Sequence, residues 1–166
     1  MSIGGICVRQ VDTAHPDESI AVVAERMHQR SVGTLVVVNH AGQAVGMLTD
    51  RDLTMRVLAK GRDPAVTAVH EVMTVAPRTA PEEASIESAL LMMRAGKFRR
   101  IPVVDRFNKL VGLITLDDVL MHLADEFIEI GRLLKRESPP GVAEEQGHEG
   151  AGLSRFQNEG RKAIGS

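Results

Sequence analysis

The sequence predicts a mixed α/β (α+β) fold in which two related repeats, each ordered β-α-β-β-α, pack as pseudo-symmetric halves around one continuous core. Three observations predict this fold. Residues 13–53 align with residues 79–119 without a gap, each copy has an apolar stripe of helical period, and each has two short β-branched runs separated by turn residues. Of the 41 aligned positions, 11 are identical. Identities in the same order indicate two copies of one structural unit.

Each copy begins with a short strand, expected near Val11 or Val75, and a first helix. Ser19 and Ser85 stand before the apolar residues of these helices, where an N-cap is expected. The apolar residues recur at three- and four-residue steps, so each helix has one face to bury. They are Ile20, Val23, Ala24 and Met27 in the first copy, and Ile86, Ala89, Leu90 and Met93 in the second.

A hairpin and a second helix complete each copy. The hairpins are predicted from the apolar runs 35–38 and 44–48 and their counterparts 101–104 and 110–114, which flank turn residues. A Thr-x-x-Asp sequence then begins each second helix, at Thr49 and at Thr115. The helix after Thr115 is expected to continue to about Arg136, because large apolar residues extend its stripe: Leu120, Leu123, Phe127, Ile130 and Leu134.

These patterns divide the chain into four parts. The first repeat covers 6–60, a linker covers 61–71, and the second repeat with its long helix covers 72–136. A short helical turn is expected at 67–72, just before the second repeat. The remainder, 137–166, is rich in Gly and poor in large apolar residues, so it is expected to be a flexible tail.

Composition excludes several classes of function. The net charge is -2, and the chain has four Phe but neither Trp nor Tyr, so nucleic acid is not an expected partner. Cys7 is the single cysteine, which leaves no intrachain disulfide and no thiolate zinc cluster. We find neither a signal-peptide pattern nor an apolar run long enough for a bilayer, so the expected location is cytoplasmic, without a membrane.

The repeated Gly-x-x-Thr-x-x-Asp is the most informative motif. It occurs as Gly46, Thr49 and Asp52, and again with Gly112, Thr115 and Asp118. One interpretation is structural, because Thr followed three residues later by an acid resembles a helix capping box. The other is functional: the carboxylate can accept from two ribose hydroxyls, and the helix N-terminus can face a phosphate. The glycine would let the backbone approach such a ligand.

No catalytic or metal-binding pattern accompanies this motif. The six His residues show no paired ligand spacing, and the Asp pairs lack a nucleophile or an oxyanion device. We therefore expect neither an enzyme nor a metal site.

With these motifs the chain resembles a tandem pair of CBS domains, the Bateman module, as a stand-alone protein. The resemblance covers about residues 6–136. It rests on Thr-x-x-x-x-x-Ser-Ile at Thr13 and Thr79, on 32–38 and 100–105, and on the two Gly-x-x-Thr-x-x-Asp motifs. It implies that the Thr and Asp hold the phosphate and ribose of an adenosine ligand. It also implies that the residues just before the apolar run that follows the first helix of each copy line the base and phosphates. These are Val32, Gly33, Thr34, Arg99, Arg100 and Ile101.

The two copies differ in charge near these positions. The second copy has Arg94, Lys97, Arg99 and Arg100 within seven residues, whereas the first copy has no obvious cation at the matching places. Arg is well suited to phosphate, so the tighter phosphate site is expected around Arg100, Thr115 and Asp118. The first copy is expected to take a less charged ligand or to stay empty.

The resemblance thus implies a regulatory module. It would bind an adenosine-type nucleotide (ATP, ADP or AMP) in the cleft between the repeats and signal by a change of conformation or oligomeric state. No cofactor is required, and S-adenosylmethionine and NAD are the lesser alternatives for the ligand. The expected partners are a second copy, bound as a homodimer through the module helices, and an effector protein of unknown identity. The alternative is a constitutive dimerisation or scaffold module whose pockets are unoccupied.

Overall fold

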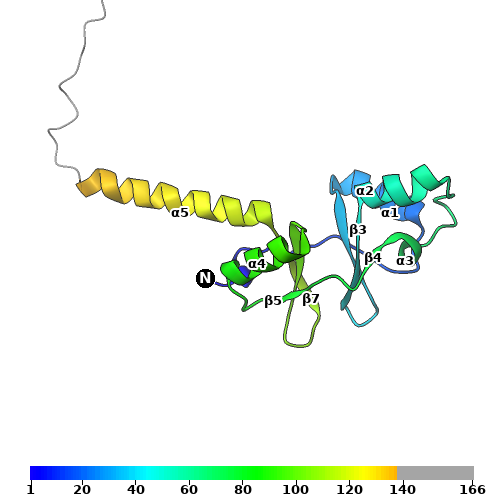
Figure 1. Ribbon diagram of the computed structural model, residues 1–166, viewed down its shortest axis with the longest axis horizontal. Coiled ribbons are helices and arrows are strands. Elements are labelled where there is room, and N and C mark those ends of the chain that lie inside the picture. Colours follow the sequence, from blue (N-terminus) through cyan, green and yellow to red (C-terminus); the bar gives the residue numbers. More distant parts are fainter. Residues whose placement is uncertain (138–166) are drawn as a thin grey trace, which may run out of the picture. The chain divides into compact units, whose positions relative to one another are not determined.

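The computed structural model describes residues 1–137 and confirms a mixed α/β fold built from two repeats (Figure 1). Met1–Phe127 form one compact unit, and a second unit begins at Ile128, within the last helix. The predicted tail lies outside the described residues, apart from Glu137, which ends that helix.

The first repeat forms a hairpin flanked by helices, as predicted. Ser19 caps its first helix by accepting from the backbone N–H of Val22. After the hairpin, three helical residues lead into a π-helical turn (Leu53–Val57) and a 3-10 turn (Leu58–Lys60). Its regular elements are β1 (Thr13–Ala14), α1 (Ile20–Arg30), β2 (Thr34–Val38), β3 (Ala44–Thr49) and α2 (Asp50–Asp52).

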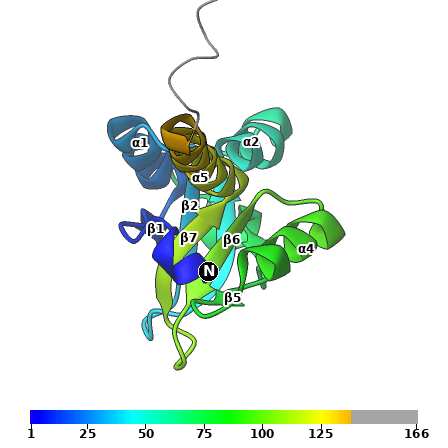
Figure 2. The same ribbon diagram turned by 90° about the vertical axis from the view of Figure 1, so that its left-hand side faces the viewer.

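The second repeat has the same order, and Ser85 caps its first helix. Figure 2 shows its strands with α4 beside them. The elements are β5 (Ala80–Pro81), α4 (Ile86–Gly96), β6 (Arg100–Val104), β7 (Leu110–Thr115) and α5 (Leu116–Glu137). The predicted continuation of the last helix to about Arg136 is confirmed.

Each sheet joins a parallel pair to an antiparallel hairpin. The strand orders are β1-β2-β3-β4 and β5-β6-β7, with β1 and β5 parallel to β2 and β6. The short strand expected near Val11 is β1, which begins two residues later, at Thr13. Val75 belongs instead to β4 (Thr74–Val75), which follows the short helix α3 (Val69–Val72) and pairs with β3 of the first repeat.

The segment before each repeat completes the other repeat. Ile3 N–H donates to the carbonyl of Ala84 at 2.8 Å, and Val69 N–H, at the equivalent position before the second repeat, donates to the carbonyl of Glu18 at 2.9 Å. Val8 likewise bridges to β7, as β4 pairs with β3. The chain therefore crosses between the repeats twice, in the same way each time.

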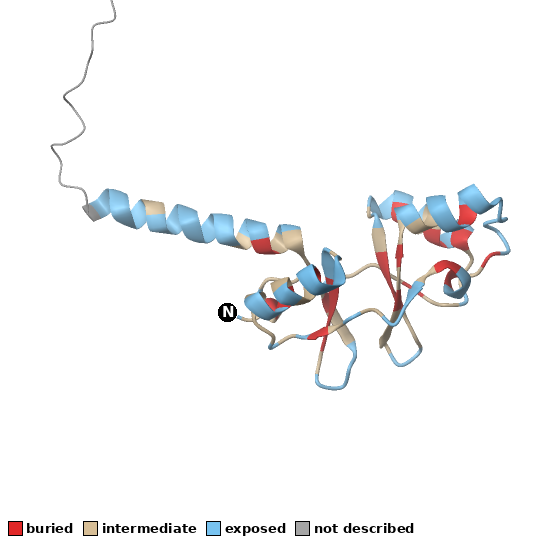
Figure 3. Ribbon diagram, viewed as in Figure 1, coloured by how far each residue is buried: buried red, intermediate tan, exposed pale blue. Residues whose placement is uncertain are grey.

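The expectation of one continuous core is wrong, because the structure has two core clusters (Figure 3). The first cluster holds the apolar faces of α1, β2 and β3 together with Val69 and Val72. The second holds those of α4, β6 and β7 together with Ile3. The two segments in which the chain crosses between the repeats, 3–8 and 69–75, are called the crossing segments. They explain why each repeat has its own core, since each segment covers apolar surface that the other repeat would otherwise leave open.

Candidate functional site

Both Thr-x-x-Asp motifs form capping boxes. In the first, Asp52 Oδ2 accepts from Thr49 N–H at 2.9 Å and from Thr49 Oγ1 at 2.7 Å, and Asp52 N–H donates back to Thr49 Oγ1. In the second, Asp118 Oδ2 accepts from the same two groups of Thr115, each at 2.7 Å. The structural interpretation of this motif is therefore confirmed. Each Asp still has a second oxygen directed elsewhere.

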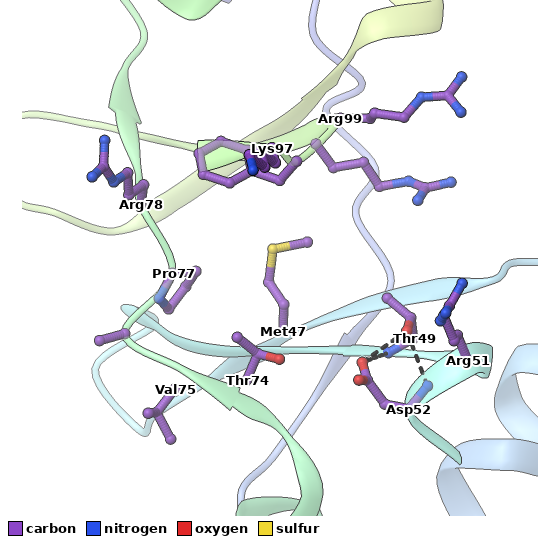
Figure 4. Close-up of a pocket in the computed structure, with 13 residues that line it drawn as sticks. Met47, Thr49, Arg51, Asp52, Thr74, Val75, Pro77, Arg78, Lys97 and Arg99 are labelled. Atoms are coloured by element: carbon purple, nitrogen blue, oxygen red, sulfur yellow. Dashed lines mark hydrogen bonds between the residues drawn. The ribbon is translucent and has the colours of Figure 1, made fainter. Parts of the chain in front are cut away.

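A cavity of about 650 Å³ lies beside the first motif (Figure 4). Residues 61–78, which join the last turn of the first repeat to the residues before β5, are called the linker from here on. One wall of the cavity comes from the end of β3 and from α2, a second from β4 and the linker residues after it, and a third from the residues that connect α4 to β6. This volume is in the range of small-molecule sites. The lining residues are Met47, Thr49, Arg51, Asp52, Thr74, Val75, Ala76, Pro77, Arg78, Lys97, Phe98, Arg99 and Arg100.

The polar lining is strongly cationic. Five basic residues line the cavity, with Asp52 as the one acid among its lining residues. Arg99 approaches Asp117 at 3.7 Å in an exposed pair. Within residues 1–137, no ion pair occupies the basic side chains of Arg78, Lys97 or Arg100. These cations are available to an anionic ligand.

The cavity also has an apolar part. Met47, Val75, Pro77 and Phe98 belong to its lining. In Figure 4, Met47 projects between the Thr49–Asp52 pair and the side that carries Lys97 and Arg99. A flat aromatic base can pack on such side chains while its polar substituents reach the charged groups.

The predicted grouping of Arg100 with Thr115 and Asp118 stays a prediction: Arg100 and Thr115 are register partners in β6 and β7. Arg100 also lines the cavity beside Thr49 and Asp52, which neither Thr115 nor Asp118 lines. The cavity beside the first motif therefore does not lack cations: Arg51 comes from the first copy, and the linker and the second copy supply the other four. The linker explains this arrangement, since β4 pairs with β3 before the chain enters β5. Of the twelve candidate residues, Thr49, Asp52, Arg99 and Arg100 line the cavity. The others, Val32, Gly33, Thr34, Gly46, Ile101, Gly112, Thr115 and Asp118, do not.

The alignment of the two repeats accounts for several of those other residues. The positions equivalent to the cavity lining include Thr115 and Asp118 together with Val32, Gly33 and Thr34. At these equivalent positions the five cations are replaced by Asp117, Asp12, Ser31, Gly33 and Thr34. The two sets of residues are thus equivalent in fold and opposite in charge.

The motif glycines have a packing role. A Cβ built on Gly46 would collide with Met73 Sδ, and one on Gly112 would meet Cys7 Sγ at 2.6 Å. Met73 and Cys7 occupy equivalent positions in the two crossing segments. Absence of a side chain at Gly46 and Gly112 therefore makes room for these segments. Ile101 also has a packing role, since it is buried in the second core cluster.

Sequence reasoning missed Met47, Arg51, Phe98 and the linker residues 74–78 as lining residues. Phe98 adjoins the predicted Arg99 and is one of four aromatic residues in the chain, so its rarity could have marked it as a lining residue. The linker carried no comparable signal, since its contribution depends on pairing with β3, a strand of the first repeat, where Thr74 lies opposite Met47.

Two further features bear on function. Residues 1–137 contain no group of three or more His, Cys, Asp or Glu side chains placed to hold a metal ion. Over the same residues, no helix combines the length and the apolar character needed to cross a membrane.

Comparison with family models and with known proteins relates this chain to CBS domain proteins. The family model described as "CBS domain" matches twice, over residues 3–59 and 69–125. The CBS domain-containing protein YhcV of Bacillus subtilis is 38% identical over 73% of this chain and 84% of its own. The uncharacterized protein MK0525 of Methanopyrus kandleri is 31% identical over 72% of this chain, which spans 61% of that relative's length.

A solved structure extends the comparison to a ligand complex. The CBS domain pair of protein MJ0100, in complex with 5′-methylthioadenosine and S-adenosyl-L-methionine, matches with a TM-score of 0.67 and 25% identity. The match covers 76% of this chain and 98% of that one.

Proposed function

Because this chain belongs to the CBS domain family and carries two such domains, we propose that it is a regulatory module that binds an adenine nucleotide in the cavity beside Thr49 and Asp52. The observation that carries this proposal is the joining of one carboxylate, an apolar wall and several unpaired cations in a single cavity. The complex of the related domain pair with adenosine-containing ligands supports an adenosine ligand here.

Three groups of lining residues would contact the ribose, the base and the phosphates of the nucleotide. The second oxygen of Asp52 would accept from a ribose hydroxyl, and Met47, Pro77 and Phe98 would pack on the base. The basic groups, Lys97 and Arg100 among them, would hold the phosphates. This arrangement favours ATP, ADP or AMP over S-adenosylmethionine, whose sulfonium would add a positive charge beside the cations.

We assign no catalytic role, since the cavity brings together binding groups without a nucleophile and its base. The single cysteine, Cys7, is free and partly buried, which fits a reducing, cytoplasmic location. Output would pass to a partner protein or to the oligomeric state.

A homodimer is part of the proposal, supported by α5. Leu120 and Phe127 are exposed in the first unit, as are Ile130 and Leu133 in the second (Figure 3). So many exposed large apolar residues on one helix mark an interaction surface. The same observation favours the second candidate function, a constitutive dimerisation module, in which the cavity has no ligand.

A calorimetric panel of ADP, ATP, AMP and S-adenosylmethionine separates these two functions. We expect the phosphorylated ligands to bind and their affinity to fall as salt is raised, because the cavity cations are exposed. We expect S-adenosylmethionine to bind more weakly. Absence of heat and of thermal stabilisation with every ligand would favour the dimerisation module, since a ligand at about 100 times its Kd stabilises by about 2.7 kcal/mol.

A further inference from the structure

Arg56 ties the proposed ribose carboxylate to the linker between the repeats. Its Nη2 lies 3.2 Å from Asp52 Oδ1 and donates to Thr74 Oγ1 at 3.1 Å. Its Nη1 donates to the carbonyl of Val72 at 2.6 Å. Thr74 itself lines the cavity. One guanidinium group therefore contacts Asp52 and, at the same time, both ends of the segment 72–74.

The remaining acceptor positions of Asp52 lie on Oδ1, beside the Arg56 guanidinium. Oδ2 already accepts two hydrogen bonds from Thr49, and Oδ1 faces Arg56. Each carboxylate oxygen has about two acceptor positions. A ribose presents two adjacent hydroxyl donors. They can both bond to Oδ1 only when the guanidinium leaves it.

The second repeat lacks this arrangement. The position equivalent to Arg56 is His122, whose Nε2 lies 4.0 Å from Glu126 Oε1. Among the described residues, none donates to Asp118 Oδ1, whereas Oδ2 carries the same two bonds from Thr115. Within this part of the chain, two capping boxes thus share one geometry, and only the first has a competing cation.

We propose that Arg56 is a positioning residue through which nucleotide binding is coupled to the linker. A vicinal diol that bonds to Asp52 Oδ1 displaces the Arg56 guanidinium, which then loses the charged partner that orients it toward Val72 and Thr74. By linkage, whatever holds Arg56 on Asp52 opposes the ligand, and the ligand in turn releases Arg56. This inference rests on the proposed function of the cavity.

Arg56→His tests it by copying the residue of the second repeat. Calorimetry compares ADP with 2′,3′-dideoxy-ADP, which keeps the base and phosphates but has no diol. Because Arg56 is 43% exposed, the Arg56–Asp52 ion pair should have only the small interaction energy of a surface ion pair. We therefore expect ADP to bind about two- to fivefold tighter to Arg56→His than to wild type. The affinity for 2′,3′-dideoxy-ADP should be the same in both proteins. Arg56→Gln, also without the cation, should reproduce the ADP result if Arg56→His folds poorly.

A matched control and the contrary outcomes complete the test. His122→Arg alters the equivalent position of the second repeat and should leave the affinity for ADP unchanged. Equal or weaker ADP binding to both Arg56 variants, with wild type still binding ADP, would overturn the role of Arg56 and leave the proposed function standing. A similar change in affinity for ADP and for 2′,3′-dideoxy-ADP would also overturn the role of Arg56, since a general structural effect does not depend on the diol. No ADP binding to any protein would overturn the proposed function itself.

Discussion

Met73 Sδ lies so close to the Cα of Gly46 that a Cβ at this position would collide with it. Cys7 holds the same position over Gly112 in the second repeat. The thiol of Cys7 is partly buried there, and burial raises its pKa above the ordinary value, so it stays a packed, protonated group. The repeated spacing of Gly from Thr within this chain is thus explained by the crossing segments.

Gly46→Ala should destabilise the protein by about 1–3 kcal/mol, because the new methyl group forces the Met73 side chain and its segment to move. Urea unfolding measures the loss. In a Met73→Ala background the same substitution should cost less, since the obstructing thioether is gone. Equal costs in the two backgrounds would show that Met73 does not fix the requirement for glycine.

The stability should depend on pH through Glu18. Arg26 hydrogen-bonds to the Glu18 carboxylate and holds the pKa of that group below its usual value, against the opposing effect of burial. A lowered native pKa means that the stabilisation is complete above the unfolded pKa of 4.5 and is lost as the pH falls through the native value. The difference in free energy of unfolding between wild type and Glu18→Gln should therefore shrink between about pH 6 and about pH 3.

The second repeat provides the control for this pH effect. Its equivalent residues are Ala84 and Met92, which do not titrate. The double variant Glu18→Ala with Arg26→Met copies these residues. Its free energy of unfolding should contain no contribution from this position that is lost at acid pH. A difference that stays constant with pH would rule out the assigned contribution of Glu18.

The protein should form a dimer through α5. Phe127 is 70% exposed and Ile130 is 49% exposed, so a charge at either position should oppose association without disturbing a buried core. Sedimentation at tens of micromolar should give about 36 kDa for wild type, twice 18.0 kDa, and the monomer mass for Phe127→Glu. Leu58→Glu changes a similarly exposed residue outside α5 and should remain a dimer. A wild-type monomer would contradict the dimer.

The local structure could be predicted from the sequence because its determinants are local. Ser19 and Ser85 cap their helices, and the apolar stripes and turn residues fix the helices and hairpins within a few positions. The ungapped alignment of 13–53 with 79–119 correctly indicated equivalence between the copies. The capping interpretation of Thr49 and Asp52 could be made in the same way.

The partners across the cavity could not be predicted, since they depend on contacts between distant segments. The alignment shows that Asp52 is equivalent to Asp118, but not which of them shares a cavity with Arg100. That choice follows from the pairing of β4 with β3, which carries the linker past the first repeat. The two core clusters depend on the same crossing, for which Ile3 and Val69 give no local signal.

In the proposed site, the first capping box and the cations of the second repeat hold one nucleotide together. Titration of ADP into the matched variants Asp52→Asn and Asp118→Asn, with Arg100→Ala, tests this most directly. Asn keeps an oxygen for the Thr partner and removes the charge, so folding is preserved in both repeats. Asp52→Asn should weaken ADP about 10-fold or more, Arg100→Ala should weaken it in the same direction and more at low salt, and Asp118→Asn should leave it unchanged. Loss of ADP binding in Asp118→Asn with full binding in Asp52→Asn would contradict this site.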